Sequence, residues 1–378
     1  SSETDESLEA TLAEVEEAAE VKVLELEPQE QATAKEEATV DITPVTPKKQ
    51  FSASMLRLRD RNRSCLMYYY QRPESALERS PWGVMHTLIS YGVDAEIQTG
   101  RQRANAIGWL CFNRPCRGMK LLQYDGQYPV PRNGPGYQGH EGQLLSMLAL
   151  SRVKATYPMR VDGHELTVQD LIDYEQVTCR PKSELTFKLV GLAHYLPSDA
   201  TWTSKWGQSW SIPRLIQEEL AQPINGACCG GTHRLIGYSM AVKVRQKRGE
   251  PLDGQWLRAQ KYVDSYHKYV IKLQNRDGSF STSWLKKRDA SGDIDRRIQT
   301  TGHILEWLVF SLPEEELTDP RIVRAVSFLS SSMLKYRQKE WEIGPRGHAL
   351  RALALYNERV FGDKPGERRA LLARRPNK

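Results

Sequence analysis

The 378-residue sequence contains no run of eighteen apolar residues, so we expect no membrane-spanning segment. It has only six cysteines, which are too few for a disulfide scaffold in a chain of this length. No stretch interleaves Arg or Lys with aromatic residues in the manner of RNA-binding proteins, so we expect no nucleic-acid partner. The composition, 39% hydrophobic and 26% charged, is that of a globular protein with one large core or two modest ones.

The first fifty residues contain no aromatic residue. They hold fourteen Asp and Glu against four Lys and Arg, a net charge of −10, so the rest of the chain carries +16. We therefore expect a disordered acidic leader over 1–52, which limited proteolysis removes to leave a core starting near Met55. The basic remainder is compatible with an anionic partner and equally with a solvated basic surface.

A short phrase recurs along the chain: a His, usually preceded by Gly, is followed by apolar residues at helical spacing. Five copies have the His and a sixth has Glu in its place. The six positions are His86, His140, Glu184, His233, His303 and His348. Their intervals of 54, 44, 49, 70 and 45 residues indicate a repeat architecture. Each phrase predicts a buried helix that begins at the His, because its apolar residues occupy more than one helix face.

Amphipathic segments alternate with these phrases. We predict helices with one solvent-exposed face over 55–71, 103–112, 166–177, 212–220, 255–273 and 320–336. A loop is expected around Trp202, Trp206 and Trp210. Half-buried and buried helices alternating about six times predict an all-α protein, an α/α toroid with six outer and six inner helices. A flat solenoid would not need such uniformly apolar second helices. We expect the toroid over 53–363 and a frayed basic tail over 364–378.

One segment carries a family resemblance. Residues 269–280 end in Asp277-Gly278-Ser279-Phe280 and are followed by Trp284. This segment resembles the Gln-Trp repeat of squalene-hopene cyclases, and its turn is similar to one in the β subunits of protein prenyltransferases. Both families are α/α toroids, so the resemblance implies that fold for about residues 55–360. It also implies that Gln274 ends an outer helix and that Phe280 or Trp284 is buried.

Three longer strings, over 178–187, 225–235 and 299–308, resemble a group of uncharacterised bacterial proteins of this toroid class. That resemblance implies a fold and no reaction. Terpenoid cyclases of the class that this sequence resembles use an acid in an Asp-x-Asp-Asp motif. The nearest string in this chain, Asp293-Ile294-Asp295-Arg296, lacks the last Asp. The Cys-Gly-Glu-Gln string of thioester domains and the Cys-His-Gly string of lanthionine synthetases are both absent.

Prenyltransferases bind zinc through Asp, Cys and His, so the resemblance directs attention to a cluster of such residues. Cys228, Cys229 and His233 form a candidate zinc site, which Asp295 or His303 would complete. The alternative is that Cys228-Cys229-Gly230-Gly231 provides tight packing at a helix start. Cys111 and Cys116 could pair in an oxidising compartment.

If the buried helices are parallel, the five histidines and Glu184 lie at one mouth of the toroid and form a candidate catalytic site. Converging helix N-termini there would attract an anion and keep the imidazoles neutral. The polar residues expected to bind substrate at this mouth are Arg234, Arg351, Arg346 and Gln299. The alternative is that each histidine bonds only within its own helix.

Two classes of function follow. One is an enzyme acting on an anionic small molecule, an isoprenoid or a glycan. Glycan lyases and hydrolases are included only because such enzymes also occur on α/α toroids. The other is a non-catalytic scaffold or binding protein that keeps the fold. The chain begins at Ser1 rather than Met, which is compatible with removal of an export signal and favours an exported or cell-envelope protein.

Overall fold

The computed structural model describes residues 50–374, and within that range the protein is mostly helical, as predicted. The residues from Leu58 onward form one compact unit. Thirteen α-helices, α2 to α14, and four two-stranded antiparallel sheets lie within 50–374. No helix in the described range combines the length and apolarity needed to cross a bilayer. The predicted acidic leader, 1–52, lies outside the described residues except for 50–52.

Six strongly buried helices carry or directly follow the recurring phrase. They are α3 (Pro81–Tyr91), α5 (Gln143–Leu150), α7 (Thr186–Tyr195), α9 (Thr232–Lys247), α11 (Ile294–Ser311) and α13 (Ile343–Phe361). Each packs against the next in chain order, and α13 also packs against α3. A Cβ on Gly302 would lie 3.0 Å from the backbone of Ala349, and one on Gly347 would lie 2.7 Å from the carbonyl oxygen of His86. The Gly before the His therefore permits close helix packing.

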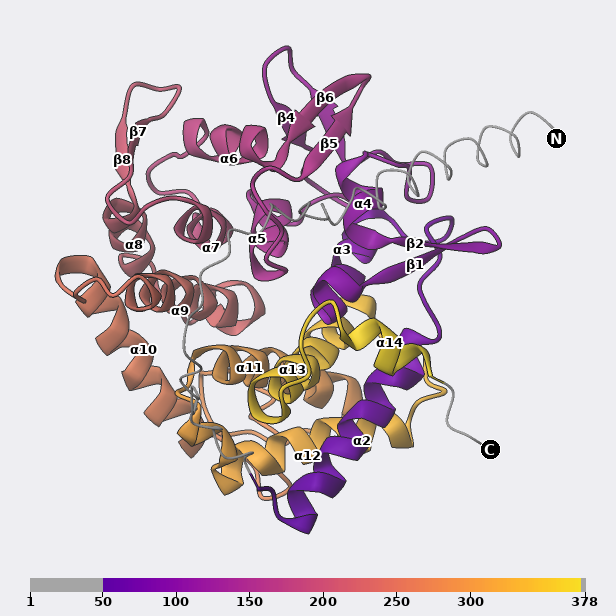
Figure 1. Cartoon of the computed structure of the whole chain (residues 1–378). Helices are drawn as coiled ribbons and strands as arrows, with labels where there is room; N and C mark the ends of the chain where they lie inside the picture. The colour runs from indigo at the N-terminus through magenta and orange to yellow at the C-terminus, as the bar shows by residue number, and fades with distance from the viewer. Residues whose placement is uncertain (1–49, 375–378) are drawn as a thin grey trace, which may run out of the picture. The chain divides into compact units, whose positions relative to one another are not determined.

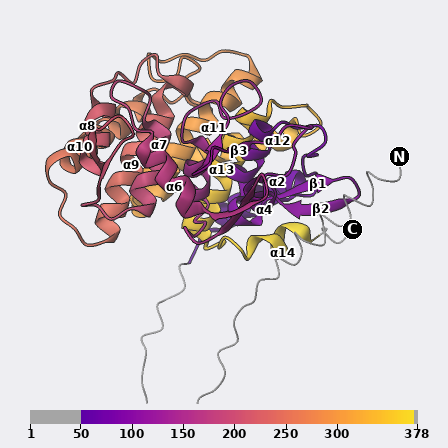
Figure 2. The same cartoon turned by 90° about the horizontal axis from the view of Figure 1, so that it is seen from above.

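Six further helices alternate with these along the chain. They are α2 (Ala53–Tyr70), α4 (Ala106–Cys111), α6 (Val168–Val177), α8 (Ile212–Leu220), α10 (Gly254–Lys272) and α12 (Pro320–Lys335). In Figure 1, α8, α10 and α12 lie outside α7, α9 and α11, and the corresponding pairs are in contact. In Figure 2, α6, α7 and α9 again lie side by side. α8 buries Ile212, Leu215, Ile216 and Glu219, which share one helix face.

Four β-hairpins were not predicted from the sequence. They pair β1 (Glu96–Thr99) with β2 (Gln102–Asn105), β3 (Leu122–Tyr124) with β4 (Pro129–Pro131), β5 (Pro158–Val161) with β6 (His164–Thr167), and β7 (Thr201–Thr203) with β8 (Ser209–Ser211). The helix predicted over 103–112 therefore begins only at Ala106, and the predicted tryptophan loop is a hairpin with Trp202 opposite Trp210. The turn Asp162-Gly163 has positive φ at both residues, as Asp-Gly hairpins favour, and this signal was missed.

The C-terminal segment is docked rather than frayed over part of its length. Helix α14 (Arg368–Ala373) lies inside the predicted tail, 364–378. The buried Arg368 places Nε 3.5 Å from Asp94 Oδ2, and the backbone N–H of Gly366 donates to the same carboxylate at 2.9 Å. An ion pair and a backbone hydrogen bond thus hold the tail to the segment that follows α3.

The turn after α10 has the packing that the sequence predicted. Phe280 is fully buried, and Gln274 Nε2 donates to the carbonyls of Gly278 at 3.1 Å and Arg321 at 2.8 Å. Gly278 has φ +95, and a Cβ there would lie 2.5 Å from the carbonyl oxygen of Arg324. The glutamine therefore connects the end of α10 to the start of α12, and only glycine fits the turn between them.

Candidate metal centre

The structure brings the five phrase histidines together in what we call the histidine cluster. The rings of His303 and His348 stack with centroids 3.8 Å apart, and His233 lies 5.4 Å from the first and 5.1 Å from the second. His86 lies 5.7 Å from His348, and His140 lies 6.3 Å from His233. Five segments far apart in the sequence therefore contribute one imidazole each to a single group.

The phrase residues do not all lie at the first position of a buried helix, where the sequence predicted them to lie. His140 and Glu184 precede α5 and α7 by a few residues, and His233 is the second residue of α9. The other three histidines lie inside α3, α11 and α13. The prediction that each buried helix begins at the phrase residue is therefore wrong for α3, α11 and α13. Upstream capping is the reason in α11, where the Asp293 carboxylate accepts from the backbone N–H of Asp295 at 3.0 Å.

Two of the histidines are oriented by their own helices. The Nδ1 atom of His86 lies 2.7 Å from the carbonyl oxygen of Trp82, and that of His303 lies 2.7 Å from the carbonyl oxygen of Gln299. A carbonyl can only accept, so the proton sits on Nδ1 and Nε2 keeps its lone pair. Burial lowers the pKa of His86 to about 4 and that of His303 well below its usual range. Both imidazoles are therefore neutral, which is the form that binds a metal.

Carboxylates hold two other histidines. His140 Nδ1 lies 2.7 Å from Glu184 Oε2, and His348 Nδ1 lies 2.5 Å from Glu306 Oε2. Burial opposes the charge on His140, but hydrogen bonds to Cys228 and Glu184 outweigh it and raise the pKa to about 9. Burial raises the pKa of Glu306 to about 7, against the opposing effect of Arg351.

Cys228 and Cys229 lie in a turn with unusual backbone geometry. The 3₁₀ segment η2 (Cys228–Gly231) has positive φ at Cys229, Gly230 and Gly231. For a residue with a Cβ, such as Cys229, this conformation costs about 1–2 kcal/mol. A Cβ on Gly230 would lie 2.5 Å from Trp284, so the turn is held tightly under that ring. Strained residues of this kind collect at functional sites.

Three side chains of this region could hold a metal ion. The ligand atoms of Cys229, His233 and His303 all lie within 4.8 Å of one another. Both ring nitrogens of the half-buried His233 are inaccessible to solvent and have no hydrogen-bond partner within residues 50–374. Buried polar atoms are seldom left unpaired, so these nitrogens point to a ligand. Thiolate and neutral imidazole are the ligands that zinc prefers.

This set differs from the predicted zinc site in one member. Cys229 and His233 belong to both, whereas His303 takes the place of Cys228. Cys228 is exposed, with its Sγ 3.8 Å from Cys229 Sγ. Hydrogen bonds from Cys229 and then from His140 lower the pKa of Cys228 to about 5. From the sequence, His303 and Asp295 were equal candidates to complete the site.

The polar residues predicted to bind substrate are engaged elsewhere. Arg234 pairs with the buried Glu219 at 2.9 Å, and Arg346 pairs with Glu74. The Gln299 side chain accepts from Arg296 at 2.8 Å, and only its backbone carbonyl reaches the histidine cluster. These three side chains thus form bonds within the fold.

The fourth predicted substrate-binding residue, Arg351, connects two regions. Its Nε lies 2.9 Å from Glu306 Oε1, and Glu306 in turn bonds His348. The same arginine lines a cavity of about 770 Å³, whose lining includes no member of the histidine cluster. Its position therefore does not match the predicted role at the mouth.

Two other sequence hypotheses can be compared with the geometry. The Asp295 carboxylate is about half exposed and pairs with Lys339 at 2.9 Å, so it is not a dry acid of the cyclase kind. Cys111 and Cys116 do not pair: both are buried free thiols, and all six cysteines are free. Burial raises the pKa of both thiols to about 12, so they are unreactive.

Comparisons with protein-family models, with curated proteins and with solved structures find no match to this chain. The candidate site therefore rests on its own geometry.

Proposed function

We propose that this protein is a zinc-dependent enzyme built on an α/α toroid. The fold proposal is supported by the succession of contacts among α3, α5, α7, α9, α11 and α13, in which the last helix packs against the first. It is further supported by α8, α10 and α12, which lie outside the buried helices in Figure 1. A succession of this kind places residues of every buried helix around one axis, where a site can be assembled.

The observation that carries the functional proposal is the pair of buried, unpartnered nitrogens of His233 beside Cys229 and His303. These three residues would hold the metal. Three protein ligands leave the fourth position of a tetrahedral zinc open to a molecule from outside the protein, as in catalytic rather than structural sites. When bound, zinc would supply Lewis acidity and lower the pKa of a coordinated water or thiol toward neutrality.

The neighbouring residues supply the means to hold a proton. Against the effect of burial, hydrogen bonds to Cys228 and Glu184 raise the pKa of His140 to about 9, so this imidazole would hold a proton that it could release beside the metal ligands. The hydrogen bond between Gln299 and Nδ1 of His303 fixes the tautomer and orientation of that ligand in the manner of other metal sites. Acid–base chemistry and metal binding are thus available within one group of side chains.

The alternative is a binding protein or scaffold in which zinc would be purely structural. Such a site needs a fourth protein ligand, and the adjacent Cys228 offers one. Its Sγ lies 3.8 Å from Cys229 Sγ, which is roughly the separation of two thiolates on one tetrahedral zinc with bonds of about 2.3 Å. The two functions therefore differ in the role of one thiol.

The test is a zinc titration of chelator-treated protein, with cobalt as a spectroscopic substitute. We expect one ion per chain and a thiolate-to-cobalt absorption band. Cys229→Ser should abolish the band and His303→Asn should weaken binding by at least about tenfold, because each removes one ligand. Cys228→Ser is the matched control, since it removes an adjacent thiol.

The outcomes separate the hypotheses. Retention of stoichiometric binding by Cys228→Ser supports the three-ligand site with an open position. A loss equal to that of Cys229→Ser indicates a closed four-ligand site and favours the structural alternative. Failure of the unmodified protein to bind zinc or cobalt refutes the proposal.

A further inference from the structure

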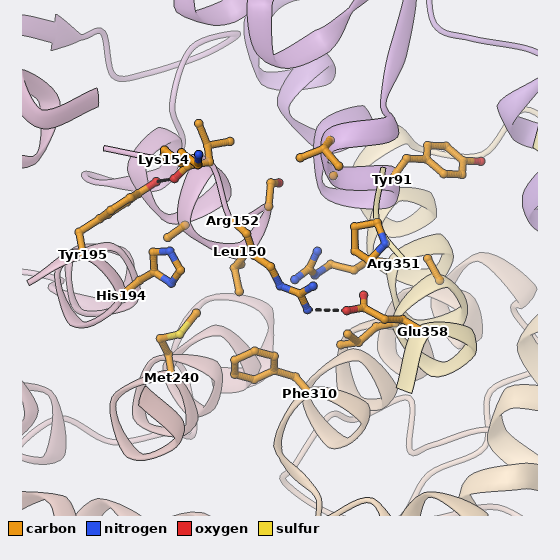
Figure 3. Close-up of a pocket in the computed structure, with 18 of the residues that line it drawn as sticks. Tyr91, Leu150, Arg152, Lys154, His194, Tyr195, Met240, Phe310, Arg351 and Glu358 are labelled. Carbon is orange, nitrogen blue, oxygen red and sulfur yellow. Dashed lines mark hydrogen bonds and ion pairs between the residues drawn. The ribbon is translucent and has the colours of Figure 1, made fainter. Parts of the chain in front are cut away.

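A cavity of about 770 Å³ lies at the other end of the buried helices from η2. The last residues of α3, α5, α7 and α9 line it, namely Tyr91, Leu150, Tyr195 and Lys247. Figure 3 shows Arg351 reaching into it from α13, with Phe310 and Met240 on the opposite wall. The volume falls within the range of roughly 300–1,000 Å³ that is usual for small-molecule sites.

The lining is strongly basic. Its cationic side chains are Arg152, Lys154, Lys243, Lys247, Arg351 and Arg368. The only carboxylate among the lining residues is that of Glu358, which pairs with Arg152 (Figure 3). Arg351 pairs with Glu306 and Arg368 pairs with Asp94, and neither of these carboxylates is part of the lining. The three lysines have no ion pair within residues 50–374, so positive charge is left uncompensated.

Helix dipoles alone do not account for this charge. Cations near helix C-termini are favourable, but the effect fades within the last turn. Lys247 is the last residue of α9, so the dipole explains it. Arg351 lies in the middle of α13 and is accounted for by its ion pair with Glu306. Lys243 lies a full turn before the end of α9 and has no such pair within residues 50–374, so its presence in the cavity requires another explanation, which an anionic ligand supplies.

Lys243 is the least exposed of the three lysines that line the cavity. It is half-buried, with its Nζ 5.6 Å from the ring centroid of Phe310. The charged groups that act on it are Arg359, which disfavours its charge, and Glu314, which favours it. Burial is the larger effect and lowers the pKa of Lys243 to about 8. An anion beside this ammonium group would relieve the unfavourable burial of its charge.

Part of the wall is apolar. Leu150, Met240, Phe310 and Leu355 line the cavity, beside uncharged polar residues that include Ser151 and Thr156. A small hydrated anion would leave this surface uncovered, whereas a wholly apolar molecule would leave the lysines without a partner. The lining thus combines a hydrophobic surface with a cationic rim, which suits a ligand that has both characters.

We propose that this cavity binds an amphiphilic anion, a carboxylate or phosphate carried on an apolar body. The anionic group lies at Lys243, and the apolar body lies against Leu150, Met240 and Phe310. The site is separate from the metal centre, because none of the candidate metal ligands Cys229, His233 and His303 is among the residues that line the cavity. The proposal therefore does not depend on zinc binding.

The test is isothermal titration of the full chain with four probes below their micellar concentrations. Decanoate and decyl phosphate carry both features, whereas decanol lacks the charge and inorganic phosphate lacks the apolar chain. We expect saturable one-to-one binding of at least one of the amphiphilic anions and much weaker binding of the other two probes. The stronger of decanoate and decyl phosphate identifies the anionic group.

Lys243→Met removes the charge and keeps most of the side-chain volume. It should weaken binding of the anion by at least about tenfold, whereas Lys243→Arg should retain it. Lys339→Met, which removes a lysine outside the cavity, is the matched control and should leave the affinity unchanged. Thermal melting establishes that each variant is folded.

Four results would each overturn the proposal. They are no binding of either anionic amphiphile, equal binding of decanol, equal binding of inorganic phosphate, and an affinity that Lys243→Met leaves unchanged.

Discussion

The substitution His233→Phe tests the metal centre through the sign of its effect on stability. In the metal-free protein, the two imidazole nitrogens of His233 are buried and have no hydrogen-bond partner in the described part of the chain. Each such group costs about 1–3 kcal/mol, and phenylalanine has neither. The phenyl ring can keep the edge contact with Phe187, whose centroid lies 5.2 Å away. We therefore expect the metal-free variant to be as stable as the unmodified protein, or more stable by up to about 2 kcal/mol.

Zinc should reverse that order. A ligand present at one hundred times its dissociation constant stabilises the folded state by about 2.7 kcal/mol. For a folded unit of this size, that corresponds to a rise of roughly 4 °C in Tm. The variant lacks one of three ligands and should gain little. The unmodified protein then becomes the more stable of the two by about 1–3 kcal/mol.

The assay is thermal and urea unfolding of both proteins, each after chelation and again after zinc addition. The matched control is His267→Phe, a half-buried histidine outside the cluster whose Nε2 lies 2.6 Å from Ser311 Oγ and whose ring stacks on Trp307. Its effect on stability should be the same with and without zinc. If His233→Phe shows the same difference from the unmodified protein in both metal states, the metal-site argument fails.

Three further predictions concern other parts of the molecule. Phe280→Ala should lower the free energy of unfolding by about 3–5 kcal/mol in urea titrations, since the ring is fully buried; a loss below about 1 kcal/mol would contradict this. Lys188→Met should cost about 3–5 kcal/mol by leaving the buried Glu175 carboxylate unpaired, and the double variant with Glu175→Leu should recover more than half of it. Affinity for an amphiphilic anion should fall as pH rises through about 8, where Lys243 loses its charge in the folded protein. In the ligand-free protein the unfolded chain holds that proton up to about pH 10.5, so this lysine should make the free energy of unfolding rise between these two pH values. The measurement is the free energy of unfolding of the unmodified protein minus that of Lys243→Met, and a fall in this difference between the two pH values would contradict the assignment.

The helix pattern could be predicted from the sequence to within a few residues for most elements. The predicted segment 212–220 coincides with α8, and 255–273 differs from α10 by one residue at each end. Amphipathic spacing is a local property, and burial of one helix face acts on residues three and four apart. The hairpins were missed because their strands are only three or four residues long, too short for a pattern of alternation to emerge.

The recurring phrase also identified the five histidines that lie together, but the sequence could not define their partners. Arg234 follows His233 directly, yet it pairs with Glu219 of α8 because adjacent residues on a helix point about 100° apart. His303 and Cys229 meet only through the packing of α9 against α11 and the left-handed turn at η2. Long-range packing likewise created the basic cavity, since its lysines and arginines come from helix ends that are far apart in the sequence. The chain thus specified its helices by local spacing, whereas side-chain direction and helix packing decided where the candidate metal ligands and the cavity lie.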